Sequence, residues 1–144
     1  MTTTKPLSKK HLVFVYGSLR RAHGNHALLR AHDAIPAGDA STLGYVLHDL
    51  GAFPGARPGA RTDSILGELY RVDREGLAAL DHLEGVASGF YERKRVRVFR
   101  RDDGPGPRVL HAWLYVLGDG YACDERHPVI ACGDWTAHRT IIRV

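Results

Sequence analysis

Short runs of apolar and β-branched residues predict most of the strands of this chain. The runs cover residues 11–16, 42–49, 64–72, 90–99 and 109–117. The first run stops at Gly17, which is typical of a buried strand that enters a turn. Residues 90–99 alternate apolar and basic side chains, which is the period-two pattern of a half-exposed strand with its basic side in water. A Gly- and Pro-rich connection joins this run to the last one and predicts a long hairpin.

Two helices are predicted between these strands. A pair of leucines with neighbouring alanines indicates a short helix after His26. Asp73 is well placed as the N-cap of a helix over residues 75–84, and Gly85 follows as its C-terminal glycine. Residues 51–59 hold too many Gly and Pro residues for regular structure and predict a loop.

The balance of elements indicates the α+β class with a curved or closed sheet, rather than a doubly wound α/β fold. With 144 residues and 44% apolar composition, the chain fits one domain, expected over residues 11–144 after a disordered tail of residues 1–10. The longest apolar run is far below the roughly 18 residues that cross a bilayer, and the polar start has no signal-peptide pattern. We therefore expect a cytoplasmic protein without a membrane partner.

Composition excludes few partners but disfavours some kinds of site. The net charge of +4 does not identify a class of ligand. Cys123 and Cys132 are interpreted as reduced thiols. The nine histidines form no recognisable zinc motif, so no metal site is predicted. The basic segment 93–101 raises nucleic-acid binding as an alternative, but it lacks interleaved aromatic residues on its exposed side. A solvated face without a nucleic-acid partner is the favoured interpretation.

The first candidate for chemistry is the segment Tyr16, Gly17, Ser18 and Leu19 at the end of the first predicted strand. A strand that enters a glycine turn aligns backbone N–H groups that bind carboxylates or phosphates. The alternative is a plain turn in which Ser18 satisfies its own neighbours. No phosphate-binding P-loop motif is present.

The second candidate is Glu84, near the end of the second predicted helix. Leu77, Leu80 and Glu84 stand at i, i+3 and i+7, which places this carboxylate on the core-facing stripe. Partial burial and the helix dipole would both raise its pKa, as a general base near neutral pH requires. In the alternative, Leu83 faces the core and Glu84 tilts into water.

A third group consists of Tyr91, Arg93 and Tyr115 on neighbouring predicted strands. These side chains could line the mouth of a pocket. The alternative is a set of core aromatics beside an Arg whose stem packs and whose head reaches water.

Together the motifs resemble the gamma-glutamylcyclotransferase-like family of the AIG2-like and butirosin-biosynthesis type. The resemblance rests on their order along residues 12–135: Val15-Tyr-Gly-Ser-Leu-Arg20, Gly67-Glu-Leu-Tyr70, Leu80-Asp-His-Leu-Glu-Gly85, Tyr91-Glu-Arg93, an aromatic strand with Tyr115, and Gly133-Asp-Trp135. It implies a small, mixed but mostly antiparallel β-barrel flanked by helices. It also implies an activity that releases an amine from a γ-glutamyl amide and forms 5-oxoproline, without a cofactor.

The resemblance also assigns expected roles to individual residues. The backbone of residues 16–19 would hold the substrate's α-carboxylate, and Glu84 would act as general acid and base. Tyr115 matches an aromatic position that lines the site in relatives, and Tyr91 and Arg93 belong to a shared motif.

The sequence alone leaves two further questions open. A non-catalytic module that binds small carboxylates is the alternative to the enzyme, and neither the amine portion of the substrate nor the oligomeric state can be predicted. Residues 51–63 and the segment from Gly118 onwards are expected to shape the amine side of the pocket.

Overall fold

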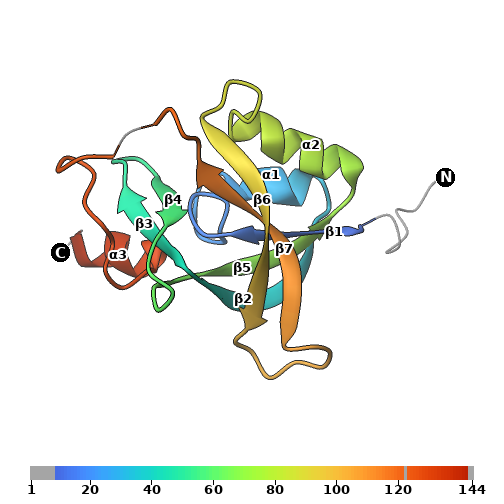
Figure 1. Cartoon of the computed structure of the whole chain (residues 1–144). Helices are drawn as coiled ribbons and strands as arrows, with labels where there is room; N and C mark the ends of the chain where they lie inside the picture. Colours follow the sequence, from blue (N-terminus) through green and yellow to red (C-terminus); the bar gives the residue numbers. More distant parts are fainter. Residues whose placement is uncertain (1–8, 122, 143–144) are drawn as a thin grey trace.

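The computed structural model describes residues 9–121 and 123–142 and is shown in Figure 1. Its elements, in chain order, are β1 (His11–Val15), α1 (His26–Ala31), β2 (Ile35–Leu43), β3 (Tyr45–Asp49), β4 (Pro54–Pro58), β5 (Ser64–Val72), α2 (Arg74–Leu83), β6 (Tyr91–Arg100), β7 (Val109–Leu117) and α3 (Trp135–Ile142). None of the helices in this described part has the length and hydropathy needed to cross a bilayer.

Five strands close into a barrel. The hydrogen-bonded order is β1-β5-β2-β6-β7, and β7 returns to β1 through a parallel pairing of Val13 with Trp113. The pairings β1–β5, β2–β5, β2–β6 and β6–β7 are antiparallel. β4 and β3 extend the sheet from β7 on one side of the barrel, as Figure 1 shows. The predicted α+β class and the mixed, mostly antiparallel barrel flanked by helices are therefore confirmed.

Alternation along the strands divides the buried residues into two clusters. On β1, Leu12 and Phe14 belong to a cluster to which all five barrel strands contribute, and which Trp135 of α3 joins. Val13 and Val15 point to the opposite face and pack in a second cluster with residues of α1 and α2. Successive side chains of a strand lie on opposite faces, so one five-residue strand supports both clusters.

The local patterns found β5 and the start of α2 correctly. β5 spans Ser64–Val72, as predicted. The side chain of Asp73 accepts a hydrogen bond from the Gly76 N–H at 2.8 Å, so its N-cap assignment is confirmed.

Three segments differ from their predictions. The strand expected over residues 42–49 is two strands, because Gly44 has a φ of +86° and turns the chain between β2 and β3. The loop expected over residues 51–59 contains β4, which pairs with β3 and touches β7 at Ala56 and Val116. α3 was not predicted. For β4 and α3 tertiary pairing or packing outweighs weak local preference, whereas the break between β2 and β3 is a local glycine turn.

The tail predicted for residues 1–10 lies mostly outside the described residues. Lys9 is described and is only 4% exposed. Its ammonium group donates to the carbonyl of His32 at 3.0 Å and to Asp73 at 3.2 Å. The fixed part of the chain therefore includes at least this residue of the predicted tail.

We predict that Gly67→Ala destabilises the protein by about 1–3 kcal/mol. A Cβ atom at Gly67 on β5 would lie 2.4 Å from the carbonyl oxygen of Val15 and 2.8 Å from the Phe14 ring, so backbone and core must both move. Gly24→Ala is the control, because nothing lies within 4 Å of the Cβ position there. Urea unfolding of both variants tests this, and equal midpoints would contradict it.

Candidate active site

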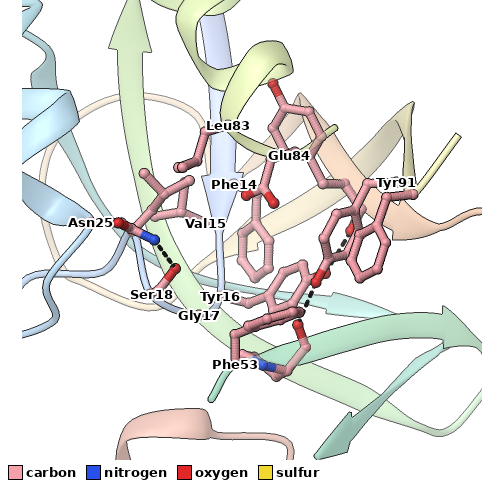
Figure 2. A pocket seen from close by; sticks show the side chains of 14 residues that line it. Phe14, Val15, Tyr16, Gly17, Ser18, Asn25, Phe53, Leu83, Glu84 and Tyr91 are labelled. Atoms are coloured by element: carbon pink, nitrogen blue, oxygen red, sulfur yellow. Dashed lines mark hydrogen bonds between the residues drawn. The ribbon is translucent and has the colours of Figure 1, made fainter. Parts of the chain in front are cut away.

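A cavity of about 230 Å³ opens where the end of β1, the end of α2 and the start of β6 meet (Figure 2). The residues that line it are Phe14, Val15, Tyr16, Gly17, Ser18, Leu19, Asn25, Phe53, Pro54, Leu83, Glu84, Phe90, Tyr91 and Tyr115. Among these described residues Glu84 is the one with an ionisable carboxylate, and no Lys or Arg is present. The cavity therefore combines an apolar wall with a single acid group.

Residues 16–19 form one wall of the cavity as the chain leaves β1. The backbone N–H groups of Gly17, Ser18 and Leu19 donate to no acceptor within the described part of the chain. The Ser18 hydroxyl accepts a hydrogen bond from the Asn25 side chain at 2.8 Å. Backbone donors without a protein partner at a turn suit an anionic group of a ligand.

A buried ion-pair network holds the chain directly after this loop. Glu68 is 2% exposed and accepts hydrogen bonds from Arg20 Nε at 3.1 Å, from the Arg21 N–H at 2.9 Å and from the Tyr70 hydroxyl at 2.8 Å. Arg20 also donates to Asp134 Oδ1, just before α3, at 2.8 Å. Sequence reasoning assigned no role to Glu68 or Asp134. The usable signal was a Glu within the apolar strand pattern of residues 64–72.

Glu84 follows the last residue of α2 and reaches into the cavity, as Figure 2 shows. Its backbone N–H still donates to the Leu80 carbonyl at 2.9 Å, so the helical register continues to this residue. Leu83 is 41% exposed, which excludes the alternative in which Leu83 fills the core and Glu84 lies in water. Burial raises the pKa of the Glu84 carboxyl from 4.5 to about 7.

Three tyrosines lie around the Glu84 carboxylate, and each of their hydroxyl groups donates a hydrogen bond to an acceptor in the protein. Tyr16 donates to the carbonyl of Tyr115, Tyr91 donates to the carbonyl of Pro54, and Tyr115 donates to Asp81, each at 2.7 Å. Burial, more than any other cause, raises the pKa of each of the three hydroxyls. These groups therefore stay neutral. The oxygens of Tyr91 and Tyr115 can offer lone pairs to a ligand, whereas the oxygen of Tyr16 already accepts the Ala56 N–H at 3.0 Å.

Arg93 is the one residue of the predicted site that does not line the cavity. Its guanidinium donates to Asp81 Oδ2 at 2.9 Å and lies over the ring of Trp113 at 4.4 Å. Asp81 also accepts the Tyr115 hydroxyl, so Arg93 contacts the cavity wall through an intermediate carboxylate. The contacts of the Arg93 guanidinium are therefore with other protein groups and not with the cavity.

Another part of the cavity wall is formed by Phe53, Pro54 and Phe90. Phe53 and Pro54 come from residues 51–63, which were expected to shape the amine side of the pocket, and Pro54 begins β4. Phe53 and Phe90 meet edge to face, with ring centroids 6.0 Å apart. No described residue from Gly118 onwards lines the cavity, although the Tyr121 ring packs against Phe90 at 5.1 Å.

Comparisons with known proteins agree with this geometry. The family model described as gamma-glutamyl cyclotransferase, AIG2-like, matches residues 13–137. The chain belongs to this family.

Individual relatives support the same assignment. A Vibrio cholerae relative is 37% identical over 126 residues, covering 88% of this chain and 96% of its own. The gamma-glutamylcyclotransferase family protein YtfP of Escherichia coli is 36% identical, covering 85% and 94%. The crystal structure of a mouse AIG2-like protein superposes with a TM-score of 0.68 at 28% identity, covering 78% of this chain and 79% of that one.

We predict that Glu84→Gln stabilises the protein at pH 8 and has little effect at pH 5. The folded state holds the Glu84 proton more tightly than the unfolded chain, since its pKa is about 7 rather than 4.5. Stability is therefore lost as pH rises from about 4.5 to 7, and the full cost, at most about 3 kcal/mol, is present above pH 7. The amide does not titrate and avoids this cost.

Thermal unfolding of wild type and variant at both pH values measures the effect. Glu125→Gln, on an exposed loop, is the matched control for the loss of one carboxylate outside the cavity. A Glu84→Gln effect that is the same at pH 5 and pH 8 would contradict a raised pKa.

Proposed function

We propose that the protein converts a γ-glutamyl amide into 5-oxoproline and a free amine, with Glu84 as general acid and base. The observation that carries this proposal is a half-buried carboxylate with a pKa of about 7 that faces unpartnered backbone donors across one cavity. A pKa near the working pH lets the same group both take and return a proton.

The two charged groups of a γ-glutamyl substrate fit different walls of the cavity. The α-carboxylate suits the N–H groups of residues 17–19, where no side-chain anion competes for them. The α-ammonium suits Glu84 and the lone pairs of the Tyr91 and Tyr115 hydroxyls, because their protons point to protein acceptors. This placement would fold the substrate so that its amine approaches its own γ-carbonyl.

The reaction then needs no nucleophile from the protein. Glu84 takes a proton from the α-ammonium, and the freed amine attacks the γ-carbonyl carbon to form the ring C–N bond. The bond to the departing nitrogen breaks from the tetrahedral intermediate. Overall two protons leave the α-nitrogen and two reach the departing nitrogen, so Glu84 ends as a carboxylate. Holding both groups in one geometry can lower the barrier by several kcal/mol, and acid–base assistance adds about a hundredfold or more.

We predict that Glu84→Gln lowers kcat for 5-oxoproline formation by at least about a hundredfold, because the amide cannot accept the proton. For the wild type, kcat/KM should rise with pH through about 7, as the carboxylate form appears. A panel of γ-glutamyl amines with chromatographic detection of 5-oxoproline measures both quantities. Turnover unchanged in Glu84→Gln would remove the proposed base. Carboxylate binding in calorimetry without turnover of any amide would favour the non-catalytic module.

We also predict that substrates with an uncharged amine portion are used more efficiently than γ-glutamyl amino acids. None of the described residues that line the cavity is a cation able to receive a second carboxylate, and Phe53, Leu83 and Phe90 offer apolar contact. We expect γ-glutamyl-butylamide to exceed γ-glutamyl-glycine by about tenfold in kcat/KM, since an unpaired carboxylate is costly to desolvate. Equal efficiency would contradict this specificity but not the activity itself.

A further inference from the structure

A second hollow, of about 170 Å³, lies at the opposite end of β1 from the candidate active site. We call it the basic hollow. Its lining residues are Lys10, His11, Leu12, Arg71, Arg95, Leu110, His111 and Trp113. It includes no residue that lines the active-site cavity. The five polar members all carry basic or imidazole side chains, and they come from the start of β1 and from β5, β6 and β7.

The strand pairing explains why a hollow forms here. β1 and β7 run parallel and share a single registered pair, Val13 with Trp113. β7 continues to pair with β6 as far as Val109 and Phe99, whereas β1 begins at His11 beside β5. β1 and β7 are therefore not paired at this end of the barrel, and the basic side chains lie around the place where the two strands separate.

Charges in the basic hollow lack protein counter-ions within the described residues. No carboxylate lines it, and the side chains of Lys10, Arg71 and Arg95 have no hydrogen-bond acceptor or ion-pair partner in that part of the chain. Arg71 is also half-buried, so its guanidinium is partly removed from water. The adjacent carboxylate along β5, Asp73, is already engaged by Lys9 and by the Gly76 N–H.

β6 carries both paired and unpaired cations: among the described residues Lys94, Arg95 and Arg97 have no ion-pair partner, whereas Arg93 has one. Its guanidinium is paired with Asp81 at 2.9 Å. Lys10 and Arg95 are exposed, so water and salt screen most of their repulsion with Arg71, but a multiply charged anion in the hollow would be attracted by all three cations.

The volume of the hollow and the surroundings of Trp113 indicate which class of anion would bind. Guanidinium groups match the geometry of phosphate oxygens through paired N–H donors. The Trp113 ring is already contacted by cations, since the guanidinium carbons of Arg93 and Arg95 lie 4.4 and 5.8 Å from its centroid. We propose that the basic hollow binds a small oligophosphate anion, independently of the proposed cyclotransferase site.

Inorganic tripolyphosphate is the probe that tests this proposal, in a low-salt buffer free of phosphate. Calorimetry should show binding, and amide spectra of labelled protein should change at His11, Arg71, His111 and the Trp113 indole rather than at residues 17–19. Arg71→Gln combined with Arg95→Gln should weaken the affinity by at least about tenfold, because two charge-assisted contacts are lost. Turnover of a γ-glutamyl amide should be unchanged, since neither residue lines the catalytic cavity.

Arg30→Gln combined with Arg61→Gln removes the same charge from exposed positions elsewhere and is the matched control. Equal weakening in both double variants would show diffuse attraction and overturn the proposal, as would the absence of binding. Spectral changes confined to residues 17–19 would assign the anion to the other cavity and also overturn it. A single-stranded oligonucleotide that binds more tightly, with changes along all of β6, would overturn the small-ligand assignment.

Discussion

The buried carboxylate of Glu68 fixes the wall of the cavity on which the remaining site geometry depends. It lies on β5, which pairs with β1 on one side and β2 on the other, and it receives donors from Arg20, Arg21 and Tyr70. A charge with so little exposure is tolerated because several donors satisfy it. The same contacts hold the chain just after Leu19, so the backbone N–H groups of residues 17–19 stay directed away from other protein acceptors.

The network also explains why motifs far apart in the sequence occur together. Arg20 joins Glu68 of β5 to Asp134, and Asp134 in turn accepts the Ala137 N–H at 3.2 Å at the start of α3. The next residue, Trp135, is 2% exposed within the core cluster inside the barrel. Loop position, strand pairing and helix docking are therefore coupled through one guanidinium group. Its replacement would remove the closest ion pair of the buried Glu68 carboxylate and leave only the Arg21 guanidinium, at 3.7 Å, as a cationic partner.

Much of this arrangement follows from local pattern, and the remainder depends on contacts between distant segments. The apolar stripe of Leu77 and Leu80 was enough to place Glu84 on the cavity side of α2, because the helix keeps its register to the end. β4 could not be found in the same way, since Pro54 to Pro58 is a strand only through its pairing with β3 and β7. Arg93 shows the limit for side chains: its strand position was correct, but Asp81 and Trp113 determine where its charge goes.

The distribution of charge is more informative than its sum. A net charge of +4 says little about ligands, yet the two hollows at the ends of β1 differ sharply in character. One holds a single acid among aromatic rings, where low polarity keeps its proton affinity high enough for exchange near neutral pH. The other gathers cations where β1 and β7 are no longer paired, and no carboxylate of the described residues lines it. α2 begins beside the start of β1, where Lys9 contacts its N-cap Asp73, and its C-terminal end brings Glu84 to the other end of β1, so the polarity of one strand and one helix separates the two environments.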